Sequence, residues 1–226
     1  MKKIKYIILC ICMLTFISAC ASDTPDTQTD TQKKTTQTNT TLDLKNQKVL
    51  IAYFTRAENI PLQGNEDATT SASLVKKDGE IVGNTGYVAH VIHDVTKGTL
   101  FPIKLDEPYS ADYDILEDLA KQQGEENARP KVSTIIENIN DYDIIFLGYP
   151  NWWYDMPMGV YSFLEQVDLS DKTIIPFVTH GGSGFSDTID TLKTMFPDAN
   201  IQNEFEIYQH DVIEKEDDII TWLNSL

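Results

Sequence analysis

Five short apolar runs alternate along the chain with longer stretches in which apolar residues recur at helical spacing. The runs at 48–54 and 143–147 are apolar at nearly every position, which is typical of strands that helices cover on both faces. Strands that alternate with helices predict an α/β fold whose parallel strands are joined by right-handed crossovers. The expected strands are 48–54, 99–105, 143–147, 172–179 and 200–208, and the expected helices are 84–95, 112–123, 132–139, 158–167, 185–196 and 211–226.

Proline and glycine mark the ends of two strands. Gly148 and Pro150 are expected to end the strand at 143–147, because proline has no N–H for the sheet and glycine permits a sharp turn. Pro102 indicates that the strand at 99–105 lies at an edge of the sheet.

The expected helix does not follow the first strand directly. Residues 57–83 contain proline, glycine and a small polar run, and the Asp78-Gly79 pair between two β-type runs predicts a hairpin. The helix begins only at about residue 84, where Asn84 or Thr85 can serve as its N-cap. We therefore expect an insert at about 57–83 between the first strand and its helix.

Residues 1–19 have the pattern of a secretory signal peptide. Three lysines precede an apolar run at 7–17, and small residues follow it. The run is short for a bilayer, so a transmembrane helix is the less favoured alternative. The sequence Ile17-Ser18-Ala19-Cys20 resembles the bacterial lipobox, which implies cleavage before Cys20 and attachment of lipid to this cysteine.

Residues 20–46 are expected to form a lipidated N-terminus and a disordered tether. They consist mainly of Thr, Gln, Asp and Lys without an aromatic residue, and such a segment buries too little apolar surface to offset the entropy of ordering it. Residues 47–226 then form the folded domain. We expect an extracytoplasmic protein that its lipid anchors to the bacterial cell membrane.

The charge and the cysteine positions exclude several classes of protein. The chain has 35 acidic and 18 basic residues among 226. Because nucleic acid is bound mainly through Lys and Arg, this balance disfavours a nucleic-acid-binding protein. Removal of residues 1–19 takes away three lysines and moves the net charge from −17 to −20. Cys10, Cys12 and Cys20 all precede the folded domain, so this domain has no thiol for a disulfide, a zinc site or a nucleophile.

Three loops of complementary chemistry leave the carboxyl ends of the first, third and fourth strands, where ligands bind in parallel sheets. The first loop brings hydroxyls and a helix N-terminus, which suit a phosphate. The second brings aromatic rings for stacking, and the glycine-rich third brings backbone N–H groups for the polar edge of a ring. Together they predict a site for a mononucleotide with a flat base. The candidate residues are Thr55, Arg56, Asn84, Thr85, Pro150, Asn151, Trp152, Trp153, Thr179, His180, Gly181, Gly182 and Phe185.

Two interpretations are open for the adjacent Trp152 and Trp153. They can form a platform on which a flat ring stacks, or they can fill the core. Core tryptophans are more often single and inside helices or strands than paired in a turn, which favours the platform.

These motifs resemble the flavodoxin family. The stretches 49–55, 148–158 and 179–184 carry the resemblance, which covers about 48–226, and the G-Y-P-x-W-W pattern at 148–153 is similar to that of lipoprotein-type members. The resemblance implies a three-layer, doubly wound, five-stranded parallel sheet in the order 2-1-3-4-5, with an insert after the first strand. It also implies flavin mononucleotide (FMN) at the point between the first and third strands where the order reverses.

The phosphate loop departs from the family's pattern. The compact loop Ser/Thr-x-Thr-Gly-Asn-Thr is present here as two halves, Thr55-Arg56 and Gly83-Asn84-Thr85, with the insert between them. The halves can meet at one phosphate if the insert folds outward as a flap. Arg56 then either helps to neutralise the phosphate or is a solvated loop charge.

The histidines and Ser183 offer further candidates. His180 can hydrogen-bond the flavin or cap its strand, and a reference pKa of about 6.5 would make its charge sensitive to pH. His90 and His93 are at helical spacing without a nearby third ligand, so we expect no metal site. Ser183 lacks the context of a nucleophile elbow, which disfavours a hydrolase.

The preferred hypothesis is an FMN-binding lipoprotein that transfers electrons to an unidentified redox partner. One alternative is an NAD(P)H- or quinone-dependent FMN reductase that uses the same pocket, although no G-x-G-x-x-G motif follows a strand. A second alternative is a flavin-free binding lipoprotein that presents the insert to a partner. The sequence leaves open whether the protein is an electron carrier or an FMN-dependent oxidoreductase.

Overall fold

The computed structural model describes residues 42, 44, 46–64, 66–68 and 73–226. The predicted signal peptide, the lipidation site at Cys20 and most of the predicted tether lie outside the described residues. Within the described part of the chain, no helix is both long and apolar enough to cross a membrane.

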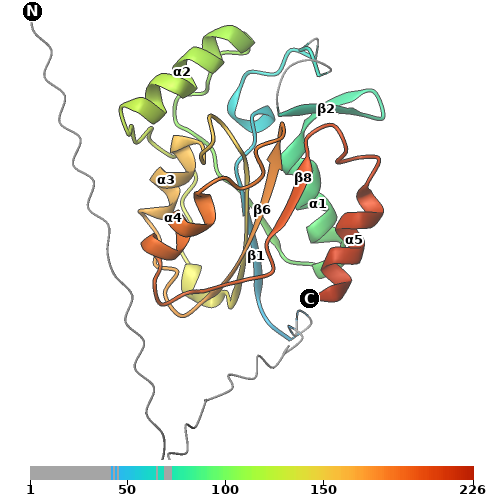
Figure 1. Cartoon of the computed structure of the whole chain (residues 1–226), viewed down its shortest axis with the longest axis vertical. Helices are drawn as coiled ribbons and strands as arrows, with labels where there is room; N and C mark the ends of the chain where they lie inside the picture. Colours follow the sequence, from blue (N-terminus) through green and yellow to red (C-terminus); the bar gives the residue numbers. More distant parts are fainter. Residues whose placement is uncertain (1–41, 43, 45, 65, 69–72) are drawn as a thin grey trace, which may run out of the picture. The chain divides into compact units, whose positions relative to one another are not determined.

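A parallel sheet forms the centre of the domain (Figure 1). Its strands lie in the predicted order, with the second strand of the main sheet at the edge, followed by the first, third, fourth and fifth. The fifth strand, expected at 200–208, is split into two short strands that both pair with the fourth. In spatial order the strands are β4 (Thr99–Pro102), β1 (Val49–Tyr53), β5 (Ile144–Pro150), β6 (Thr173–His180), and then β7 (Asn200–Ile201) and β8 (Phe205–Tyr208).

Helices cover both faces of the sheet, which gives the predicted three-layer architecture (Figure 1). Successive residues of β5 point to opposite faces, so Phe146 shares a buried cluster with α1 and α5, and Leu147 shares one with α3 and α4. The remaining helix, α2, lies near α3. The helices are α1 (Asn84–Thr96), α2 (Tyr113–Glu125), α3 (Met158–Leu164), α4 (Thr188–Met195) and α5 (Glu216–Ser225).

The central strands β1 and β5 are buried at every position, as their apolar sequences predict. β5 ends at Pro150, as predicted, but it continues through Gly148, so the prediction that Gly148 helps to end the strand is wrong. Gly148 provides space and not a turn, because a Cβ at this position would lie 2.0 Å from Cζ of Phe177 on β6.

The helix expected at 132–139 is also wrong. Val132 pairs with Leu105 in an isolated antiparallel bridge, and a short 3-10 helix, η2 (Ile139–Asp141), follows. The hydroxyls of Ser133 and Thr134 form hydrogen bonds with the backbone at 104–105. Such bonds offer the backbone an alternative to helix, and here they hold the segment beside the residues that follow β4.

The insert after β1 contains the predicted hairpin. β2 (Leu74–Lys77) and β3 (Glu80–Gly83) pair in antiparallel orientation, and the connecting Asp78 and Gly79 both have positive φ, as the favoured two-residue hairpin turn requires. A 3-10 turn, η1 (Ala57–Asn59), begins the insert. Leu74 is fully buried and anchors the hairpin to the apolar cluster on the α3 side of the sheet.

Gly148→Ala should lower the free energy of unfolding by roughly 1–3 kcal/mol, because the added methyl group must displace the Phe177 ring in a packed core. Urea unfolding followed by circular dichroism measures this loss. Gly124→Ala in α2 is the control, since a Cβ there meets no atom within 4 Å. Alanine in a helix is favoured over glycine by about 0.5–1 kcal/mol. Equal stability of the two variants would contradict the close contact at Gly148.

Candidate functional site

The loops after β1, β5 and β6, together with α2, line a cavity of about 550 Å³. This volume is in the range of small-molecule sites in proteins. Six of the predicted site residues line it: Arg56, Asn151, Trp152, Trp153, Gly181 and Gly182. Tyr154 and Ser183 of the same loops also line it. The sequence did not indicate the remaining lining residues, which are Tyr113, Leu116, Glu117 and Ala120 of α2 and Gln209.

The two halves of the predicted phosphate loop are in contact, although the insert separates them in sequence. Gly83 lies so close to Thr55 that a Cβ at position 83 would be 1.6 Å from Oγ1 of Thr55. Gly83 is also the N-cap of α1, so the prediction that Asn84 or Thr85 caps this helix is wrong. Strand β3 runs directly into α1 at Gly83, which leaves both of the following residues inside the helix.

Two polar side chains at this contact are buried without a hydrogen-bond partner among the described residues. Thr55 is 2% exposed and Asn84 is 0% exposed, and neither Oγ1 of Thr55 nor the amide atoms of Asn84 have a partner. Unpaired buried polar groups are costly, so they call for a ligand or another explanation. A hydroxyl and an amide that can donate beside the N-terminus of α1 fit an anionic group such as a phosphate.

Thr85 and Thr179 connect the same helix to the fourth strand of the main sheet. Their hydroxyl oxygens are buried and 2.7 Å apart, which ties the start of α1 to the carboxyl end of β6. The N–H of Asn151 donates to the carbonyl of Thr179 at 2.8 Å. The three loops predicted to form the site are therefore joined by direct contacts.

Ser73, which the sequence did not single out, joins the insert to the edge of the sheet at which its strands have their carboxyl ends. This edge is called the rim below. Its carbonyl accepts the N–H of Asn84 at 3.1 Å, and its own N–H donates to Oε1 of Gln209 at 3.2 Å. Its hydroxyl accepts the indole N–H of Trp152 at 2.9 Å. The insert therefore does not fold wholly outward, because its residue next to the hairpin is bound to the rim. A serine in a small polar run carries no sequence signal for this role.

The two adjacent tryptophans have different environments. Trp152 packs edge-on against Phe54 and Tyr109, with ring centroids 5.6 and 5.8 Å away, and so fits the core interpretation. Trp153 is 49% exposed, and its indole N–H donates to the carbonyl of Glu117 on α2 at 3.3 Å. Trp153 is thus the indole that is placed to serve as a platform.

Trp153 and Tyr154 form the tip of a strained turn. The backbones of Trp152 and Asp155 exchange hydrogen bonds of 2.9 and 3.1 Å, and the two residues between them have φ angles of 54° and 67°. Such turns favour Asn-Gly, and the left-handed conformation costs about 1–2 kcal/mol for a residue with a Cβ. Strain of this kind gathers at functional loops, and here it presents two large rings beside the cavity.

Arg56 is buried, with 2% of its surface exposed, so the interpretation as a solvated loop charge is wrong. Its guanidinium lies 5.2 Å from the ring centroid of Tyr113, and its Nη2 donates to the carbonyl of Ala111 at 3.2 Å. Burial lowers the pKa of Arg56, while Tyr113, Glu66 and Asp67 act to raise it. Because a guanidinium stays protonated in proteins, Arg56 places a fixed positive charge in the cavity wall.

Three further predicted site residues, Pro150, His180 and Phe185, are not among the residues that line the cavity. Nδ1 of His180 accepts the N–H of Gly182 at 2.9 Å, which holds the glycine-rich loop. Phe185 packs edge-on against Tyr149 with centroids 6.5 Å apart. Pro150 ends β5. These residues support the loops and do not face the cavity.

The histidines of α1 are not among the residues that line the cavity. Nδ1 of His93 is 2.7 Å from the carbonyl of Gly98, just beyond the end of the helix, and His90 packs edge-on against Tyr53. In the ranges that the structure describes, no group of three or more His, Cys, Asp or Glu residues is suited to hold a metal ion.

The sheet order defines a doubly wound α/β protein, and a cavity of small-molecule size lies at the carboxyl ends of its strands. The flavodoxin family model matches residues 79–226, and the chain belongs to this family. No curated protein matches the sequence.

Solved structures of flavoproteins are similar to this chain. A candidate flavoprotein from Bacteroides eggerthii DSM 20697 is 28% identical, with a TM-score of 0.59, and the match covers 79% of this chain and 97% of that chain. A candidate flavoprotein from Bacteroides uniformis ATCC 8492 is 22% identical, with coverages of 80% and 99% and a TM-score of 0.57. A flavoprotein from Lactobacillus acidophilus NCFM, solved in complex with FMN, is 19% identical, with coverages of 76% and 99% and a TM-score of 0.51.

Tyr154→Gly should be more stable than Tyr154→Ala by about 1 kcal/mol. Both substitutions remove a ring that is 74% exposed, but only glycine adopts a positive φ without a steric cost. Urea unfolding of the two variants measures the difference. Tyr208 in β8 is the control position, because glycine weakens an ordinary strand and the order of the two variants should reverse there. The same order at both positions would argue against strain at Tyr154.

Proposed function

We propose that this protein binds FMN at the rim of the sheet, in and beside the cavity described above, and that it transfers electrons as a lipid-anchored flavoprotein. The observation that carries the proposal is that unpaired buried donors beside a helix N-terminus occur at the same rim as an aromatic-walled cavity. The similar Lactobacillus acidophilus protein, whose structure is a complex with FMN, supports this choice of cofactor. When bound, the flavin supplies the redox chemistry, and the protein binds and orients it.

The phosphate is assigned to the contact between the two half-loops. The hydroxyl of Thr55 and the amide of Asn84 are buried and have donor capacity to spare. The hydroxyl of Thr85 and the N-terminus of α1 add to the same region, and a helix N-terminus favours an anion. Arg56 contributes the positive charge of the cavity wall, which partly offsets the phosphate charge.

The flavin ring is assigned to the space between the turn at Trp153-Tyr154 and the glycine-rich loop at Gly181-Gly182. Trp153 and Tyr154 provide exposed aromatic faces for stacking. Gly181 and Gly182 carry no side chain, so their backbone N–H groups can approach the polar edge of the ring. The supporting residues that hold these two loops are Pro150, Asn151, Trp152, Thr179, His180 and Phe185.

Titration of the purified protein with FMN should quench flavin fluorescence and saturate at one flavin per chain. Thr85→Ala should raise the dissociation constant for FMN by about tenfold to a hundredfold, because a hydrogen bond to a charged group is worth roughly 1.5–3 kcal/mol. Thr85→Ser keeps the hydroxyl and serves as the matched control. Unchanged affinity for FMN in Thr85→Ala would contradict the assignment of the phosphate to the N-terminus of α1.

Two other results, one from this titration and one from an assay of NAD(P)H oxidation, would replace the proposal. A protein that binds no FMN would correspond to the flavin-free binding alternative. An FMN-loaded protein that oxidises NAD(P)H with turnover would be the reductase alternative, whereas an electron carrier oxidises it no faster than free FMN does.

The lipid anchor is assigned to Cys20. Cys20→Ser should move the protein from the membrane fraction to the soluble fraction and abolish its labelling by radioactive fatty acid, because a serine cannot form the thioether that carries the lipid. Cys12→Ser is the control, since this cysteine lies within the apolar run of the leader. Membrane retention and unchanged labelling in Cys20→Ser would exclude the anchor.

A further inference from the structure

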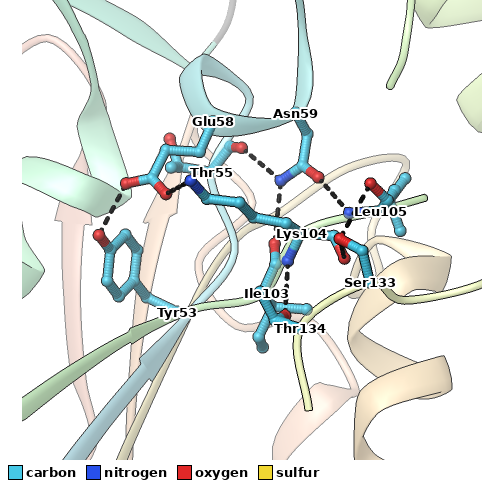
Figure 2. A network of polar contacts seen from close by, with 9 residues as sticks. All are labelled: Tyr53, Thr55, Glu58, Asn59, Ile103, Lys104, Leu105, Ser133 and Thr134. Atoms are coloured by element: carbon cyan, nitrogen blue, oxygen red, sulfur yellow. Dashed lines mark hydrogen bonds and ion pairs between the residues drawn. The ribbon is translucent and has the colours of Figure 1, made fainter. Parts of the chain in front are cut away.

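Asn59, in the first turn of the insert, is buried with its side chain fully engaged in hydrogen bonds (Figure 2). Its Nδ2 donates to the carbonyl of Thr55 at 2.9 Å and to that of Ile103 at 3.0 Å. Its Oδ1 accepts the N–H of Leu105 at 2.8 Å. A single amide therefore joins the end of β1 to the segment that follows β4.

The bond to Thr55 acts on the half-loop that is assigned to the phosphate. A trans peptide unit is planar, with its C=O and N–H groups on opposite sides. When Asn59 binds the carbonyl of Thr55, it therefore also fixes the direction of the Arg56 N–H. In a compact phosphate loop, neighbouring residues of one turn can hold such peptides. Here the insert follows Arg56 directly, and the Asn59 side chain holds the peptide instead.

Asn59 does not line the cavity, and of its three side-chain hydrogen bonds the one to the carbonyl of Thr55 reaches the half-loop that is assigned to the phosphate. The ring, by contrast, is assigned to residues that take no part in the three hydrogen bonds of the Asn59 side chain, such as Trp153 and Gly182. Loss of the Asn59 amide should therefore weaken the hold on the phosphate more than the hold on the ring.

We propose that Asn59 is a positioning residue that fixes the Thr55-Arg56 half-loop for a phosphate group and so makes the site select phosphorylated over unphosphorylated flavin. This inference rests on the proposed function, since it presumes a flavin site. In this proposal, one side chain of the insert orients the half-loop, which neighbouring residues of the loop itself would orient if the insert did not divide it.

Asparagine is suited to this position for a chemical reason. Its amide supplies two donors and an acceptor, and all three are used here. The carboxylate that Asn59→Asp introduces would have the same shape but would offer only acceptors to the carbonyls of Thr55 and Ile103. In an Asn59→Ser variant, the hydroxyl at a helical position can reach the carbonyl four residues earlier, which is that of Thr55, but it loses the other two partners.

Fluorescence titrations with FMN and with riboflavin test the proposal, because the two flavins share the ring and differ in the phosphate. Asn59→Asp should raise the dissociation constant for FMN by about tenfold or more and leave that for riboflavin nearly unchanged. Asn59→Ala removes the amide without adding a charge, and it should show the same selective loss if the Asn59→Asp protein does not fold. Asn59→Ser should retain most of the affinity for FMN, although it is less stable than the wild type.

Ser133→Ala is the matched control. The Ser133 hydroxyl donates to the carbonyls of Lys104 and Leu105, so its loss disturbs the same segment without touching Thr55 (Figure 2). This variant should keep the wild-type preference for FMN.

Several outcomes would overturn the proposal. Equal losses of FMN and riboflavin affinity in Asn59→Asp and Asn59→Ala would make Asn59 a purely structural residue, as would equal behaviour of Asn59→Ser and Asn59→Ala. A wild-type protein that binds the two flavins equally well would contradict the inference while flavin binding stands. A wild-type protein that binds neither flavin would instead defeat the proposed function, and this inference with it.

Discussion

The close contact between Gly83 and Thr55 is the constraint on which the rim of this protein depends. The chain leaves the sheet after β1, runs through the insert and must return so that α1 starts beside the strand it left. A side chain at position 83 would overlap the hydroxyl of Thr55, so only glycine permits this approach. The entropy of closing a loop grows slowly with its length. Once the two ends meet, a long insert is therefore tolerated almost as well as a short loop.

The rim also contains features that lower the stability of the fold. Thr55 and Asn84 bury polar atoms without partners in the described part of the chain, and Trp153 and Tyr154 hold a backbone conformation that suits Asn-Gly. The core offsets these costs, because β1 and β5 are buried at every position between two helical layers. Unpaired buried polar groups and a strained turn at one end of a well-packed sheet are typical of functional sites.

The sheet could be predicted from the sequence because its signals are local: apolar runs mark the strands and Asp78-Gly79 marks the hairpin. The strand order came from the family resemblance and not from periodicity. The failures involve partners far apart in the chain. The helix expected at 132–139 is lost because Ser133 and Thr134 bind the backbone at 104–105. The roles of Ser73 and of α2 at the cavity follow from tertiary contacts alone, and no local pattern encodes them.

An acidic protein can still hold a phosphate, because the two electrostatic effects act over different distances. The net charge of −17 is spread over the whole chain, and salt screens exposed charges beyond about 8 Å at physiological ionic strength. Arg56 and the first turn of α1 are buried, and buried charges are screened much less than exposed ones. An anion at the proposed phosphate position would sense mainly these local groups. An extended polyanion would lie across many acidic side chains, so the same charge distribution that suits the proposed mononucleotide disfavours nucleic acid.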